Sequence, residues 1–166
     1  MKHAGFTLLE VLITSIVMVL LVLSAYPTLQ TASRRQEQVT NMALLETCMV
    51  QGIATAKSPT LATTATVHIT FTTSPISCTV AEADATGTKT TIATSAIANP
   101  TNYTLTLSPT VTNNEYVIST NPPYQFTIPG PTTQLMMVSL RTVAAPVTVN
   151  STFFNLITGT INTRSS

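Results

Sequence analysis

The chain has 166 residues, of which 8% are charged and 44% are hydrophobic, and its formal net charge is +1. This length accommodates one modest domain with an appendage, because single domains cluster at roughly 100–200 residues. The near-neutral charge excludes a single-signed field that would steer nucleic acid or an acidic substrate, so no specific nucleic-acid site is expected. Threonine is abundant, and its branched side chain favours the half-exposed face of a sheet. We therefore expect a β-rich part that faces an extracellular or periplasmic environment.

The first predicted element is an apolar helix that follows the short basic N-terminus. From Phe6 to Tyr26 the residues are apolar or small, with Glu10 as the one charged side chain. About 21 helical residues cover roughly 31 Å, the thickness of the hydrocarbon core of a bilayer. The segment therefore predicts one membrane-spanning helix.

A second helical segment, residues 28–57, follows Pro27. Proline removes one helical hydrogen bond, so we expect a kink at Pro27 rather than the end of the helix. Recurrent spacings near three, four or seven predict an apolar stripe that consists of Leu29, Ala32, Val39, Ala43, Val50 and Ile53. The wetter side would carry Arg34, Arg35 and Glu37, and Ser58-Pro59 would close the helix.

The rest of the chain predicts strands and turns. Apolar and polar residues alternate with period two in residues 66–72, 103–107 and 124–128, and further strands are expected in residues 135–143 and 147–157, on either side of Ala145-Pro146. Residues 83–100 lack a period and predict a loop. We expect an α+β fold, in which the outer half of a long kinked helix packs on an antiparallel sheet of roughly four to six strands.

The junction Gly5-Phe6-Thr7-Leu8-Leu9-Glu10-Val11 opens the apolar run. This segment resembles the class III signal of type IV pilins and of the related pseudopilins, over residues 1–27 and more weakly to the end of the long helix. The resemblance implies that a prepilin peptidase cuts between Gly5 and Phe6 and methylates the new N-terminus at Phe6. It divides the chain into a leader at residues 1–5, a transmembrane or filament-core half helix at 6–27, an amphipathic half helix at 28–57 and a threonine-rich β-domain at 58–166.

Glu10 is the unusual residue of the apolar run. A carboxylate inside an apolar helix costs about 2.5–3.5 kcal/mol at mid-membrane and less near the interface. The resemblance implies that Glu10 neutralises the N-terminal amine of Phe6, on its own or a neighbouring subunit, once the leader is removed. In an apolar filament core such a pair would also fix the register of the subunits.

The function that the resemblance implies is that of a structural subunit of a type IV pilus or pilus-like filament, not of an enzyme. The partners would be other pilin subunits, the prepilin peptidase, an assembly platform in the inner membrane and membrane lipid. The chain would cross the inner membrane once before assembly, and would lie in a pilus at the cell surface or in the periplasm afterwards. One alternative is a pseudopilin of type II secretion or competence.

Two alternatives of other classes explain the apolar run differently. In a membrane-anchored adhesion or binding module, the β-domain would do the work and the helix would only anchor it. In an ordinary secretory protein, residues 1–25 would be a signal peptide cleaved near Ala25. Glu10 inside the apolar run and the helix that continues past Pro27 count against the signal peptide, whereas Glu10 and the Gly5-Phe6 junction favour the filament subunit over the binding module.

Cys48 and Cys78 are the two cysteines of the chain. Two cysteines in an exported chain are usually paired. Their disulfide would close a loop of about 30 residues and stabilise the protein by roughly 3–4 kcal/mol. The alternative is two free thiols, one of them buried between helix and sheet.

No metal or other cofactor is expected. His3 falls in the leader, so His68 is the lone histidine of the mature chain, whereas a zinc site needs three or four ligands. We expect His68 to be solvated on the polar face of a strand. Glu82 and Asp84 supply too few oxygens for calcium, which takes six to eight.

No catalytic residue is assigned from the sequence. Neither a nucleophile with its base nor a glycine-rich phosphate loop is evident. Asn102-Tyr103-Thr104 and Asn150-Ser151-Thr152 match the N-glycosylation sequon, but such matches arise by chance in a threonine-rich chain.

Overall fold

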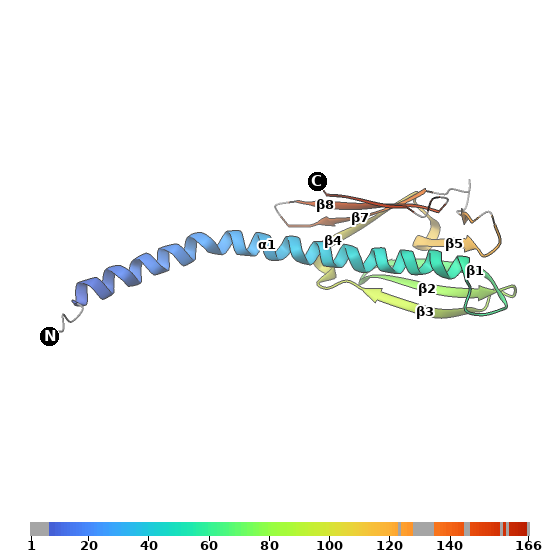
Figure 1. Ribbon diagram of the computed structural model, residues 1–166, viewed down its shortest axis with the longest axis horizontal. Helices are drawn as coiled ribbons and strands as arrows, with labels where there is room; N and C mark the ends of the chain where they lie inside the picture. Colours follow the sequence, from blue (N-terminus) through green and yellow to red (C-terminus); the bar gives the residue numbers. More distant parts are fainter. Residues whose placement is uncertain are drawn as a thin grey trace. The chain divides into compact units, whose positions relative to one another are not determined.

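The computed structural model describes residues 7–122, 124–127, 135–144, 147–156, 158 and 160–165. The chain divides into two compact units, Met1–Glu37 and Gln38–Ser166. One helix, α1 (Leu8–Lys57), runs through both units, and all described strands belong to the second unit. The long helix and the antiparallel sheets (Figure 1) confirm the α+β fold class that the sequence predicts.

Helix α1 continues through Pro27. The hydroxyl of Thr31 donates a hydrogen bond to the Pro27 carbonyl at 2.9 Å, and the chain is helical on both sides of the proline. The helix ends at Lys57, directly before Ser58-Pro59, as expected because the residue before a proline avoids the α region.

Two antiparallel sheets follow the helix. Sheet A has the strand order β3-β2-β1-β5-β6 and sheet B has the order β4-β7-β8-β9. The strands of sheet A are β1 (Thr64–Thr73), β2 (Ile76–Asp84), β3 (Lys89–Ala96), β5 (Glu115–Ser119) and β6 (Phe126–Thr127). The strands of sheet B are β4 (Tyr103–Ser108), β7 (Leu135–Thr142), β8 (Val149–Asn155) and β9 (Ile161–Ser165). Short 3-10 helices, η1 (Pro100–Asn102) and η2 (Thr112–Asn114), precede β4 and β5.

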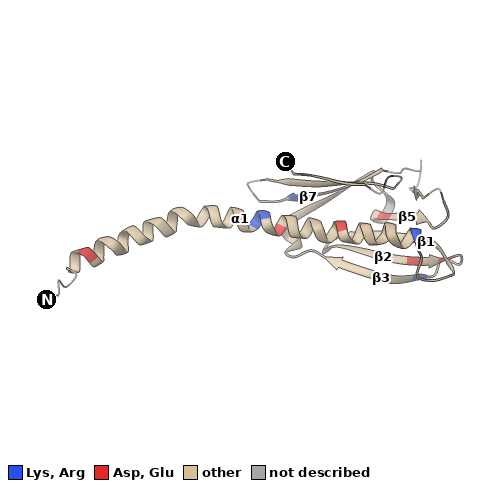
Figure 2. Cartoon of the chain, viewed as in Figure 1, with Lys and Arg blue, Asp and Glu red and all other residues tan. Residues whose placement is uncertain are grey.

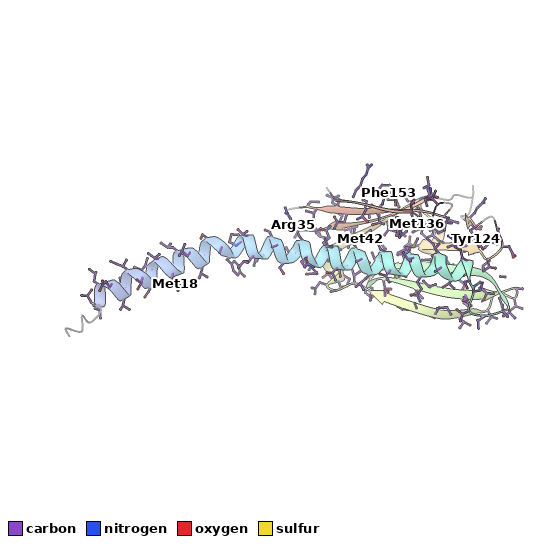
Figure 3. All side chains as sticks on the ribbon, in the orientation of Figure 1. Met18, Arg35, Met42, Tyr124, Met136 and Phe153 are labelled. Carbon is purple, nitrogen blue, oxygen red and sulfur yellow. A yellow bond between two sulfur atoms is a disulfide. The ribbon has the colours of Figure 1, made fainter. Side chains whose placement is uncertain are left out.

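Period-two alternation places one face of each central strand in the core. In β1 the side chains of Val67, Ile69 and Phe71 are buried between partly exposed polar neighbours, which confirms the predicted alternation. On sheet B, Met136 is buried on the side of β7 that faces the helix, whereas Phe153 of β8 is 37% exposed on the outer side (Figure 3).

The second half of α1 packs on both sheets within the unit Gln38–Ser166. Met42, Leu45 and Met49 are fully or almost fully buried and belong to the same core cluster as the inward residues of both sheets. Gly52 brings α1 close to β1, because a Cβ atom at this position would lie 2.4 Å from Cδ1 of Ile69. Any larger residue at position 52 would therefore force the buried Ile69 side chain to shift.

Polar side chains on this helix face bind strand ends and connecting segments. The amide group of Gln38 donates to the carbonyls of Leu140 and Thr148, at 3.0 and 3.2 Å, and accepts from the Thr148 hydroxyl. Asn41 exchanges two hydrogen bonds of 3.0 Å with the backbone of Ala98. The hydrogen-bonding groups of these buried amides have partners, so their burial leaves no polar group unpaired. The same bonds fix the position of the helix relative to the strands.

The predicted apolar stripe on the second half of α1 is wrong as a description of the buried face. Val39 is 56% exposed and Val50 is 43% exposed, whereas the buried face consists of Gln38, Asn41, Met42, Leu45, Cys48, Met49, Gly52, Thr55 and Ala56. Ile53 alone of the predicted stripe packs against the core. Two polar amides, a glycine and a cysteine lie on the buried face. Each makes a specific tertiary contact that the spacing of apolar residues cannot predict.

The predicted loop in residues 83–100 and the predicted strand number are also wrong. Strand β3 lies inside that segment, and the described residues form nine strands in two sheets. Edge strand β3 is partly exposed on both faces, so it lacks the alternation that identifies a half-buried strand. Ile128 and the Ala145-Pro146 separator lie outside the described residues.

Candidate functional site

The first half of α1 is an apolar helical surface that the described residues of its unit, 7–37, leave uncovered. Large apolar side chains from Leu8 to Leu29 are exposed, and α1 is long and apolar enough to cross a membrane by length and composition. Figure 2 shows this half without Lys or Arg colour from its start as far as the adjacent pair Arg34-Arg35. Met18, labelled in Figure 3, projects away from the helix axis like its neighbours.

Four hydroxyl groups in this half are bonded to the backbone of the helix itself. Thr14, Ser15, Ser24 and Thr31 each donate to a backbone carbonyl three or four residues earlier, at 2.6–2.9 Å. Such bonds occupy hydroxyls that would otherwise need a partner in an environment without water. The helix therefore offers an apolar surface despite its serines and threonines.

Glu10 takes part in a reciprocal hydrogen-bonded arrangement with Thr7 at the start of α1. Its Oε2 accepts from the backbone N–H of Thr7 at 3.1 Å and from the Thr7 hydroxyl at 3.2 Å. In return, the backbone N–H of Glu10 donates to the Thr7 hydroxyl at 3.3 Å. With Thr7 at the N-cap and Glu10 three residues later, this is a capping box.

The predicted cleavage junction, Gly5 and Phe6, lies outside the described residues. Cleavage after Gly5, methylation of Phe6 and the pairing of Glu10 with the Phe6 amine therefore stay predictions. Thr7 is a site residue that the sequence interpretation missed. The spacing Thr-x-x-Glu before an apolar run is itself a recognisable helix-start signal.

Residues 1–26 match the family described as the prokaryotic N-terminal methylation motif. This motif is the class III signal of type IV pilins, and it supports a type IV pilin-like chain, a class that includes the pseudopilins. The motif and the apolar helix fit membrane anchoring. A search of curated proteins and a search of solved structures each found no match.

Cys48 of α1 and Cys78 of β2 form a disulfide with their Cα atoms 6.3 Å apart. Both residues are buried. The bond joins the helix to sheet A across 30 residues of sequence, so it holds the helix against the core that Met49 and Gly52 also contact.

The carboxylates of Glu82 and Asp84 bind protein donors. Buried Glu82 accepts from the backbone N–H groups of Thr60 and Leu61, at 2.7 and 2.9 Å, and from the Thr64 hydroxyl at 2.7 Å. Asp84 accepts from the N–H groups of Thr86 and Thr88 in the β2–β3 turn. Among the described residues no group of three or more His, Cys, Asp or Glu side chains is placed to hold a metal ion.

His68 is not simply solvated, which corrects the expectation from the sequence. Its Nδ1 lies 2.8 Å from Oε1 of Glu115, and the same oxygen accepts from Nζ of Lys89. The cluster joins three strands of sheet A, namely β1, β3 and β5. Burial raises the pKa of the Glu115 carboxyl, but the hydrogen bonds and charges of Lys89 and His68 hold it below its ordinary value.

The Nε2 atom of His68 contacts the Thr66 hydroxyl at 3.1 Å, so hydroxyl, imidazole and carboxylate lie in a row. Lys89 already compensates the Glu115 carboxylate. The side chains of His68, Lys89 and Glu115 tie β1, β3 and β5 together, so we assign the cluster a structural role in sheet A.

Proposed function

We propose that the chain is a structural subunit of a type IV pilus or a related pilus-like filament. After cleavage between Gly5 and Phe6, the subunit would leave the membrane and pack its apolar half helix against the same segment of other subunits. Lipid contacts would be exchanged for protein contacts of similar polarity, so little net hydrophobic free energy would change. The prepilin peptidase and an assembly platform in the inner membrane would be the partners of this step.

One observation carries the proposal: the methylation motif at residues 1–26 leads into an exposed apolar helix with Glu10 as its single charge before Arg34. A simple anchor has no use for a carboxylate that costs free energy in lipid. A filament subunit does, because a carboxylate in an apolar bundle pairs with the amine of its partner in only one register. In any other register both charges would be buried unpaired, at a cost in free energy.

The test is the assembly of Glu10→Leu. Removal of the charge should leave membrane insertion and cleavage intact, because a carboxylate disfavours the membrane. The Phe6 amine would then lose its partner in the filament core, and loss of one member of a buried ion pair costs enough to lower assembly on the order of a hundredfold. The measurement is the fraction of processed subunit recovered in sheared filaments.

Glu10→Ala and Val11→Leu are the matched variants. Glu10→Ala should fail like Glu10→Leu, because the effect arises from the charge and not from side-chain bulk. Val11→Leu changes the adjacent apolar side chain and no charge, so it should assemble normally. Wild-type recovery of both Glu10 variants would refute the role given to Glu10, and absence of the processed wild-type subunit from sheared filaments would refute the filament proposal.

A further inference from the structure

We propose that Thr7 is a positioning residue for Glu10, which it holds in a capping box at the start of α1. The consequence of this positioning for filament assembly rests on the proposed function. Thr7 would bind the carboxylate within its own subunit, before a second subunit meets it. The Glu10 side chain would therefore enter assembly already oriented.

The hydrogen bonds define the orientation. Both donors of Thr7, the backbone N–H and the hydroxyl, converge on Oε2 of Glu10 at 3.1 and 3.2 Å. The Glu10 side chain is tied at one oxygen to the residue three positions earlier, and the returning bond from its own N–H to the Thr7 hydroxyl closes the arrangement. A long, flexible side chain thereby loses its rotational freedom before binding, which lowers the entropic cost of a later contact.

The same bonds explain how the precursor tolerates the charge. While the leader is attached, the nitrogen of Phe6 is a peptide amide and carries no positive charge. The donors of Thr7 are present both before and after cleavage, and a carboxylate in an apolar environment is stabilised by such donors. Cleavage would add a charged amine at Phe6, next in sequence to the residue that already binds Glu10.

The first test observes the capping box directly. Full-length precursor labelled with ¹⁵N is placed in detergent micelles, and the backbone amide resonance of Thr7 is followed while pH is varied. We expect this resonance to shift with the same midpoint as the Glu10 carboxyl, and to become independent of that titration in Glu10→Leu. A Thr7 amide that does not respond as Glu10 titrates would overturn the proposal.

The second test asks whether Thr7 acts through Glu10 in assembly. Thr7→Val keeps the shape and the N–H but removes the hydroxyl that donates to the Glu10 carboxylate, and should lower the filament fraction about fivefold, as loss of one hydrogen bond of ordinary net strength would. Thr7→Ser keeps both donors and should assemble like the wild type. In a Glu10→Leu background the hydroxyl still accepts from the N–H of residue 10, so Thr7→Val should have a clearly smaller effect than it has with Glu10 present.

Two outcomes of the second test would also overturn the proposal: wild-type assembly of Thr7→Val, or an equal loss with and without Glu10. The amount of processed subunit in the membrane and the Cys48–Cys78 disulfide serve as controls for cleavage and folding in every variant. The proposed filament function fails by a different result, absence of the processed wild-type subunit from sheared filaments, and the amide titration does not depend on assembly. Failure of the inference and failure of the function are therefore separable.

Discussion

Glu82 is a buried carboxylate that is stabilised by hydrogen bonds from backbone and hydroxyl donors where α1 passes into β1. Burial raises the pKa of its carboxyl, whereas the hydrogen bonds from Thr60, Thr64 and Leu61 lower it, and the net pKa lies below the ordinary value. Because the folded pKa is depressed, the stabilisation is complete above the unfolded value of about 4.3. It is lost as pH falls through the folded pKa.

We predict that Glu82→Gln lowers the free energy of unfolding at pH 7 by about 1–3 kcal/mol, because one amide oxygen cannot serve three donors. The variant should also lose less stability than the wild type when pH falls below about 4, since the titrating group is gone. The measurement is denaturant unfolding followed by circular dichroism at both pH values.

Asp84→Asn is the control for this prediction. It makes the same carboxylate-to-amide change at the last residue of β2, which is partly exposed and whose Oδ1 accepts the hydrogen bonds from the turn that follows. An equal loss in both variants at pH 7 would show that burial of Glu82 is not the cause.

At the scale of elements, α1 shows which features of the fold are predictable from sequence. Its beginning, its continuation through Pro27 and its end at Lys57 follow from local signals, namely the apolar run and the prolines. Its buried face does not, because Gln38, Asn41 and Gly52 lie there through hydrogen bonds and a close approach to distant strands. The edge strand β3 was missed for a related reason, since a strand wet on both faces has no alternation to detect.

The buried face of α1 can be tested by a pair of truncations on neighbouring turns. Leu45→Ala should lower the free energy of unfolding by about 2–5 kcal/mol, because it opens a cavity between helix and sheets. Val39→Ala removes an apolar side chain that is 56% exposed and should change stability by no more than about 0.5 kcal/mol. Similar losses in the two variants, measured by denaturant unfolding, would contradict the observed face.

At the scale of the whole molecule, the two units Met1–Glu37 and Gln38–Ser166 differ in how much apolar surface they expose. The first exposes an apolar helix, and the second has a buried core with a disulfide of its own. The methylation motif and Glu10 were recognisable from sequence because they are local. The capping box at Thr7 has a local signal in Thr-x-x-Glu, whereas the ionic cluster at His68 depends on strand pairing across sheet A.

We predict that a fragment of residues 38–166 folds as a monomer without detergent, whereas the full chain requires detergent or lipid. The oxidised fragment should be more stable than the reduced fragment by about 3–4 kcal/mol, because the disulfide between Cys48 and Cys78 closes a loop of 30 residues. Sedimentation and denaturant unfolding with and without reductant measure both effects. Aggregation of the oxidised fragment would show that the first unit is needed for folding.

The self-bonded hydroxyls of Thr14, Ser15, Ser24 and Thr31 have a consequence for how substitutions in this segment are tolerated. A hydroxyl that donates within its own helix is not available to donate to a neighbouring subunit. Replacement by alanine or valine should therefore change the packing of the helix but not which subunits it binds. The residues that determine how this segment pairs with another subunit then lie in its first turn. Random mutagenesis of the apolar half should yield a broad plateau of accepted apolar sequences, interrupted at Thr7 and Glu10.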